Sequence, residues 1–120
     1  MNEYSDRLAA LKLRYPFRRW IETGLGQYTE EAVARFAAIF DRLIAALGAM
    51  GEGAPEDCKL AAFREAVEAL NVLNEEDESL IETGEREQLC ELCNRIATAA
   101  DLDPGKYGGG EGPASEWRDW

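Results

Sequence analysis

Apolar residues recur every three or four positions between residues 29 and 48, and this spacing constrains the fold more than any other feature of the chain. Such a period predicts an amphipathic helix with one apolar stripe. The stripe consists of Val33, Phe36, Ala37, Phe40, Leu43, Ile44 and Leu47. Thr29 is a suitable N-cap, two glutamates follow it, and Gly48 stands where a C-cap is expected. The stripe must be buried, so we expect this helix at the centre of a helical core.

Further amphipathic segments are predicted on both sides of this helix. The first spans residues 3–14 and is interrupted by Pro16, after which residues 17–23 form a short second turn. Another begins at Pro55, and the last is capped by Thr83. No stretch alternates apolar and polar residues long enough to require a strand. The expected core comprises Phe36, Phe40, Ile44, Phe63, Val67, Leu70, Leu89 and Ile96.

The composition changes after Asp103, where a tail rich in glycine and proline begins. Ser115 is expected to cap one helical turn near the end of the chain, with Trp117 and Trp120 on the same side. We therefore predict an all-α fold in which residues 1–103 form a compact bundle of about four main helices. The Gly-rich C-terminal tail, residues 104–120, ends in a short helical turn and docks on the same domain.

Acidic residues dominate the charge: 24 Asp and Glu against 13 Lys and Arg give a net charge of −11, and histidine is absent. This balance argues against direct binding of nucleic acid, which depends on clustered cations. The lack of histidine removes the commonest general base and metal ligand. No apolar run approaches the roughly 20 residues that cross a bilayer, and the first residues do not form a signal peptide. We expect a cytoplasmic protein that is not an enzyme and holds no cofactor or metal.

The three cysteines form no recognisable chemical site in the sequence. Cys90 and Cys93 have the CxxC spacing, but they lie inside a predicted helix that no strand precedes, which disfavours a redox motif. A zinc site needs four ligands, and only Cys58 remains. Cys93 falls on the apolar face of its helix, so we favour packing for it. An odd number of cysteines in a chain without an export signal also fits free thiols in the cytosol.

The strongest local feature is an acidic run from Glu75 to Glu91, with eight acids and one base, or −7 within 17 residues. A solvated loop leading into a helix N-terminus explains the later acids. It explains the first four poorly, because adjacent carboxylates repel one another. The alternative is a surface built to meet a basic partner. Its candidate charged residues are Glu75, Glu76, Asp77, Glu78 and Glu82.

Two groups of aromatic residues have competing interpretations. Trp117 and Trp120 either contact a partner, since tryptophan is enriched among binding hot spots, or dock on the bundle. The stretch from Lys12 to Trp20 interleaves cations with aromatic rings, as nucleic-acid contacts often do. We favour pairing of these cations with the acidic remainder and packing of the rings, because a net charge of −11 repels a polyanion.

The acidic run 75–78 between two helices and the tail 102–120 resemble the small acidic immunity proteins that bacteria encode beside toxins. The resemblance implies non-catalytic binding to a cognate protein toxin, as a monomer or a one-to-one heterodimer, with carboxylates occupying the basic active-site cleft. The basic N-terminal stretch departs from that pattern. The alternative function is an acidic nucleic-acid mimic or regulatory adaptor that binds a DNA- or RNA-binding protein.

Overall fold

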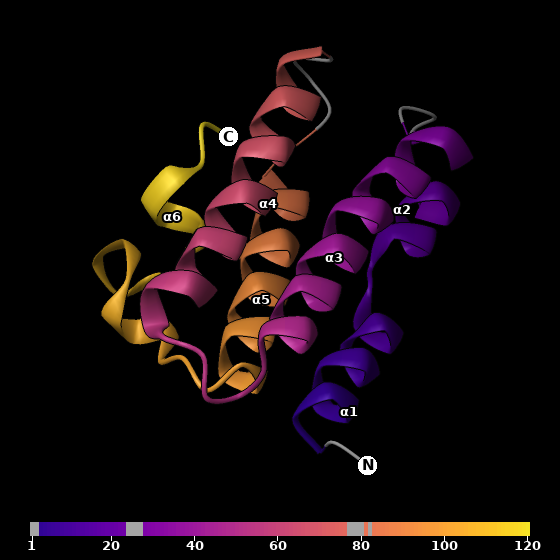
Figure 1. The fold of residues 1–120 in the computed structure, drawn as a ribbon. Helices are drawn as coiled ribbons and strands as arrows, with labels where there is room; N and C mark the ends of the chain where they lie inside the picture. Colours follow the sequence, from indigo (N-terminus) through magenta and orange to yellow (C-terminus); the bar gives the residue numbers. More distant parts are fainter. Residues whose placement is uncertain (1–2, 24–27, 77–80, 82) are drawn as a thin grey trace.

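The computed structural model describes residues 3–23, 28–76, 81 and 83–120 (Figure 1). These residues form helices and no strand, which confirms the predicted all-α fold. The elements are α1 (Glu3–Ala10), the 3₁₀ turn η1 (Leu11–Arg14), α2 (Phe17–Thr23), α3 (Glu30–Met50), α4 (Glu56–Glu76), α5 (Thr83–Ala99), the 3₁₀ turns η2 (Pro104–Lys106) and η3 (Gly108–Gly110), and α6 (Ala114–Trp117). None of the helices within the described ranges is long and apolar enough to cross a membrane.

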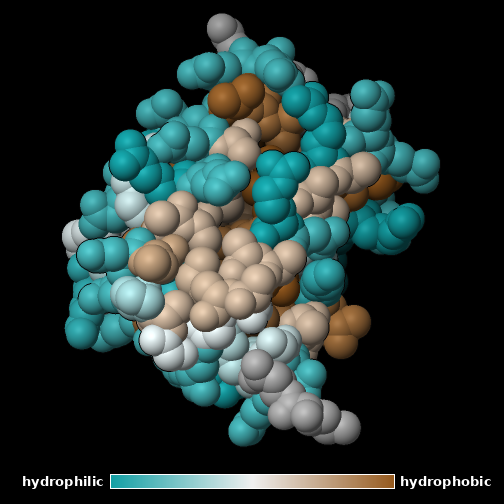
Figure 2. Space-filling model, viewed as in Figure 1, coloured by the Kyte–Doolittle hydropathy of each residue, from teal (hydrophilic) through white to brown (hydrophobic). Residues whose placement is uncertain are grey.

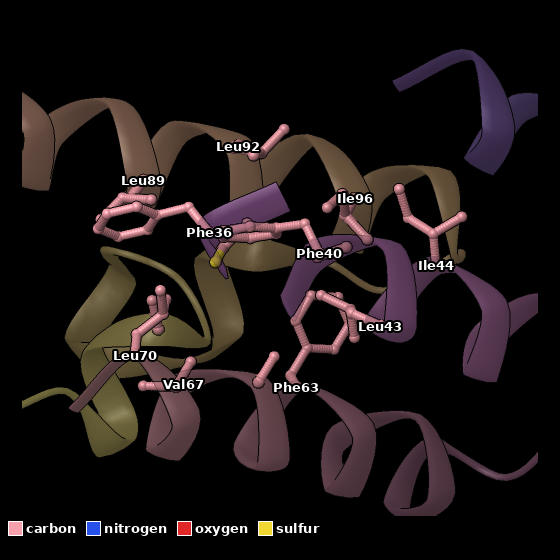
Figure 3. Close-up of a cluster of buried hydrophobic side chains, with 14 of the residues drawn as sticks. Phe36, Phe40, Leu43, Ile44, Phe63, Val67, Leu70, Leu89, Leu92 and Ile96 are labelled. Carbon is pink, nitrogen blue, oxygen red and sulfur yellow. The ribbon is translucent and has the colours of Figure 1, made fainter. Parts of the chain in front are cut away.

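The long helices α3 and α4 lie side by side, and α5 lies behind them in the view of Figure 1. The N-terminal elements α1 and α2 pack along the side of α3, and α6 packs against α4 and α5. Figure 3 shows the buried side chains of α3, α4 and α5 meeting in one cluster. All eight residues expected in the core are buried, so that prediction is confirmed.

The start of α3 agrees with the sequence prediction, and its end does not. The Ala32 N–H donates to Thr29 Oγ1 at 3.1 Å, which confirms Thr29 as the N-cap. Gly48 is not the C-cap, because α3 continues to Met50. The chain turns at Gly51 instead, where φ is +85° and the N–H donates to the Leu47 carbonyl at 3.2 Å. Glycine can lie inside a helix at modest cost, and only the left-handed residue ends it.

The first predicted segment is not one helix. It divides into α1 and the 3₁₀ turn η1, which ends two residues before Pro16. A proline disfavours α-helical geometry in the residue before it, and a 3₁₀ turn tightens the chain ahead of that point. Pro55 lies just before α4 rather than within it, and its carbonyl accepts the N–H groups of Cys58 and Lys59.

The C-terminal tail folds back onto the bundle. Ser115 does not cap α6, because Pro113 occupies the N-cap position and Ser115 lies inside the helix. Trp120 lies beyond the helix end, after Arg118, which is extended with φ −71° and ψ 143°. Gly112 has φ +121° and lies against the side chain of Asn94, so a larger residue has no room there.

A buried lysine joins α4 to the segments that precede it and follow α5, at the lower end of the bundle in Figure 1. Lys59 is only 4% exposed, and its Nζ donates to the carbonyls of Glu52 at 2.7 Å and Ala100 at 2.8 Å. Arg7 reaches the same end, where it donates to the Ala99 carbonyl at 3.1 Å. Both cations thus meet the C-terminal carbonyls of α5, where the helix dipole favours positive charge. We call this the basal end, defined by Arg7, Glu52, Lys59, Ala100 and Asp101.

Candidate functional site

The acidic run begins on a helix. Glu75 and Glu76 form the end of α4, and both are exposed. The other candidate charged residues, Asp77, Glu78 and Glu82, lie outside the described residues. The helix α4 therefore continues beyond Leu73, its last buried apolar residue, and the first two acids of the run are part of it.

Two side-chain contacts link the elements near the end of α4 and the start of α5. Arg35, in the second turn of α3, forms an ion pair with Glu76, which brings the start of α3 to the end of α4. Tyr28 precedes α3, and its hydroxyl donates to Glu85 of α5 at 3.0 Å. We call this group the acidic end; it lies at the top of Figure 1. Its members are Glu30, Glu31, Glu75, Glu76 and Glu85.

The position of Glu75 and Glu76 opposes helix stability. The C-terminal end of a helix carries partial negative charge, which favours cations there and disfavours carboxylates. The last turn of α4 contains no basic residue, and the cation that pairs with Glu76, Arg35, comes from another helix. By contrast, Glu30 and Glu31 lie in the first turn of α3, where the dipole favours them. The helix dipole therefore disfavours both acids at the end of α4, and of the two only Glu76 has an ion pair, with Arg35, within the described residues to offset this.

The two C-terminal tryptophans differ in exposure. Trp120 is 8% exposed and belongs to the core, whereas Trp117 is half-buried and packs against it. Asn71 of α4 holds this segment by donating to the Trp117 carbonyl at 2.9 Å and accepting the Asp119 N–H at 2.9 Å. The Arg118 guanidinium lies over the Trp120 ring at 5.6 Å from its centroid. Trp117 thus offers more surface to a partner than Trp120 does.

The rings of the basic, aromatic stretch pack inward, as favoured from the sequence. Phe17 and Trp20 are buried, and Phe17 stacks on Phe36 of α3 with ring centroids 5.7 Å apart. The Trp20 indole N–H donates to Gln88 of α5. Burial raises the pKa of the Tyr15 hydroxyl, and the hydrogen bond to Asp41 at 2.8 Å raises it further. These contacts confirm the packing interpretation for the rings.

The cations of the N-terminal elements lie in different places. Arg7 and Lys12 pair with acids, Lys12 with Asp41 at 3.8 Å. Arg14 and Arg19 line a cleft between the N-terminal segment and α5, together with Arg95. Sequence reasoning did not single out Arg95, because it lies 76 positions after Arg19 and only the fold brings the two to one cleft.

Cys90 and Cys93 are poor nucleophiles in this environment. Cys93 is buried among core residues, and burial raises the pKa of its thiol. Burial also raises the pKa of the half-buried Cys90, whereas Cys58 is exposed. A raised thiol pKa lowers the fraction of reactive thiolate. Within the described ranges, no group of three or more Cys, Asp or Glu side chains could hold a metal ion.

An apolar face lies on the side of the molecule seen in Figure 2, over α3 and α4. Alanines make up much of it, and a shallow hollow there is lined by Ile39, Ala46, Ala62 and Ala69. Val72 stands at one edge and is 53% exposed. Exposed apolar atoms of this kind are common on protein surfaces.

Comparisons with known proteins found no match. No family model, no curated protein and no solved structure matches it. The features of the surface that bear on function are the exposed carboxylates at the ends of α3, α4 and α5.

Proposed function

We propose that this protein is a non-catalytic binding protein of the bacterial immunity type. It neutralises a cognate protein toxin by occupying the toxin's basic active-site cleft with its acidic end. The proposed partner-binding residues are Glu75, Glu76, Asp77, Glu78 and Glu82, with Trp117 as a neighbouring apolar contact. The protein acts in the cytoplasm, as a monomer until it forms a one-to-one complex.

The observation that supports this proposal is the placement of Glu75 and Glu76. Both are exposed at the negative end of a 21-residue helix, in a turn without a basic residue of its own. Residues that conflict with local stability tend to be retained for function. A surface that meets a cation-rich cleft gives these carboxylates the positive partners that α4 lacks.

The proposed mechanism follows from electrostatics. An acidic surface and a basic cleft attract each other before contact, which raises the association rate. Salt screens this attraction over about 8 Å at physiological ionic strength. Once docked, the carboxylates take the positions of the phosphate groups that the toxin's cleft otherwise binds, so the substrate is excluded without any chemical step.

The test begins with the product of the neighbouring gene. The two proteins should co-purify, and the toxin's activity should fall at a one-to-one ratio. Stopped-flow association is then measured across a salt series for wild type and for the double variant Glu75→Lys with Glu76→Lys. We expect association roughly ten times slower at low salt, with a flatter salt dependence.

A matched control separates the acidic end from net charge. Glu65→Lys with Glu68→Lys makes the same charge change in the middle of α4, where both residues are exposed. We expect this control to slow association much less. Equal slowing by both pairs, or wild-type rates for the first, would contradict the proposal. A DNA- or RNA-binding regulator as the co-purified protein would support the nucleic-acid mimic instead.

A further inference from the structure

The cleft between the N-terminal segment and α5 carries a charge opposite to that of the protein as a whole. Arg14, Arg19 and Arg95 line it with one acid, Glu91, so its formal charge is +2 in a chain of −11. The cleft encloses about 380 Å³. We propose that it is a second interaction surface, separate from the acidic end, which takes an acidic, leucine-containing peptide segment of a protein partner.

An exposed apolar side chain stands beside these arginines. Leu13 lies on η1, lines the cleft and is 89% exposed. An adjacent hollow shares Glu91 and Arg95 with the cleft and continues along α5 over Ala10 and Leu11. A basic region thus passes directly into an apolar one. That combination suits a segment in which carboxylates and apolar side chains alternate.

The cleft is held in shape by the packed core beneath it. Trp20 binds Gln88, which lines the cleft from α5. Tyr15 also lines it, and its hydroxyl donates to Asp41 on α3. The backbone that carries Leu13 and Arg14 is therefore tied to both α3 and α5. A preformed surface loses less conformational entropy when a partner binds.

The arginines of the cleft can bind the carboxylates of an occupant without the loss of an interaction that contributes much to stability. Arg95 pairs with Glu91 at 2.9 Å, but both side chains are largely exposed, and an exposed i,i+4 pair contributes little to stability. A carboxylate of a partner can therefore share or replace Glu91 at Arg95. Arg14 is exposed, and no ion pair with a residue of the described ranges involves it.

A peptide fits this cleft better than nucleic acid does. Single-stranded nucleic acid binds through bases stacked on exposed aromatic rings, and here Phe17 and Trp20 are buried in the core. Tyr15 lines the cleft, but its ring is half-buried and packs against Phe17 and Phe40. A long polyanion also meets the field of the whole acidic protein, whereas a short segment with a few carboxylates stays within the local positive region.

The experiment uses a fluorescein-labelled synthetic peptide in which glutamate and leucine alternate, titrated with the full chain and followed by anisotropy at low salt. Its control peptide alternates glutamine and leucine. We expect the acidic peptide to bind, and Arg14→Glu to weaken it roughly tenfold. The matched variant Arg18→Glu makes the same charge change in the same stretch but does not line the cleft, so it should weaken binding less than about twofold.

A second pair of variants tests the apolar contact. Leu13→Ser should weaken binding roughly threefold or more, whereas Val72→Ser, on the α3–α4 face, should leave it unchanged. Circular dichroism checks that each variant folds, and Arg14→Gln replaces Arg14→Glu should the latter unfold. Absence of peptide binding, equal effects of Arg14→Glu and Arg18→Glu, or tighter Arg14-dependent binding of oligothymidylate would each overturn the proposal.

Discussion

The two ends of the bundle use charge in opposite ways. At the basal end, Lys59 and Arg7 meet the C-terminal carbonyls of α5, so cations lie where a helix dipole favours them. At the acidic end, Glu75 and Glu76 lie at the C-terminus of α4, where the same dipole disfavours them. The end of α5 thus meets cations from other elements, whereas α4 ends in two acids of its own.

The difference separates charges that stabilise the fold from charges that are free to serve another purpose. Lys59 is buried and makes two hydrogen bonds to backbone, so its charge is part of the packing. Glu75 is exposed and opposes the helix that carries it. Substitutions at the basal end should therefore destabilise the fold, and neutralisation at the acidic end should stabilise it.

Replacing the buried lysine should have the largest effect. Lys59→Met keeps most of the side-chain volume but leaves the carbonyls of Glu52 and Ala100 without their donor. Each unsatisfied buried group costs about 1–3 kcal/mol, so we expect a loss of roughly 3 kcal/mol. Urea denaturation measures it, with Lys106→Met, at an exposed lysine, as the control. A loss below about 1 kcal/mol would show that the basal end does not depend on this cation.

The C-terminal tail packs against α4 and α5, and Trp120 should contribute to stability rather than to binding. Trp120→Ala removes the side chain of a residue that is only 8% exposed. We expect a loss of about 2–3 kcal/mol, at the lower limit for large core residues, because Trp120 lies beyond the end of α6 rather than within a packed helix. Thermal unfolding measures it. A variant that melts like wild type but binds the partner weakly would instead make Trp120 an interface residue.

Trp117 provides the comparison within the tail. Its half-buried ring packs against the core from α6, so Trp117→Ala should lower stability by less than Trp120→Ala does. The same variant should weaken partner binding, because the exposed part of the ring lies beside the proposed surface. Calorimetric titration with the partner gives the second measurement.

The surface cation at the basal end should matter less than the buried one. Arg7→Met removes the bond to the Ala99 carbonyl and two pairs at 3.4 Å, with Glu52 and Asp101. These pairs are partly exposed, and such pairs contribute little, so we expect a loss of about 1 kcal/mol in total. A loss as large as that for Lys59→Met would mean that exposure does not set the difference between the two cations.

The smallest effect should have the opposite sign. Glu75→Gln removes a negative charge from the C-terminal turn of α4, and we expect stabilisation by about 0.3–1 kcal/mol. High salt should shrink this gain. Glu65→Gln, in the middle of α4, should change stability less. If Glu75→Gln destabilised the protein, the contrast between the two ends would fail, and Glu75 would have to be regarded as a structural residue.

Local features of the fold could be read from the sequence. The apolar period from Val33 to Leu47, the Thr29 cap and the core residues all depend on neighbours within a few turns, and all agree with the structure. Helix ends were less predictable. Gly48 carried the right residue type for a C-cap, but Gly51 adopts the left-handed conformation, and sequence alone does not say which of two nearby glycines turns the chain.

The candidate surfaces were predictable only in part. The acidic run could be recognised from composition alone. That Glu75 and Glu76 lie at the negative end of the α4 dipole follows only from the structure, which shows where α4 ends. Two of the three arginines of the basic cleft could be noticed in the sequence, because Arg14 and Arg19 belong to a cationic stretch. Arg95 could not be linked to them, because most other charged residues of its helix are acidic and nothing local relates it to the N-terminus. Leu13 lies between Lys12 and Arg14 in the sequence, and an apolar residue flanked by two cations is the local pattern that indicates this cleft.

The sequence by itself determined the helical class, the core and the excess of negative charge. These follow from residue types and their spacing, and they need no knowledge of distant contacts. Tertiary structure decided which charges are buried, paired or left exposed. Lys59 meets the carbonyl of Ala100 across 41 positions, and Trp20 meets Gln88 across 68. Burial and pairing depend on which elements pack together, and that choice is made by the whole core rather than by any one segment.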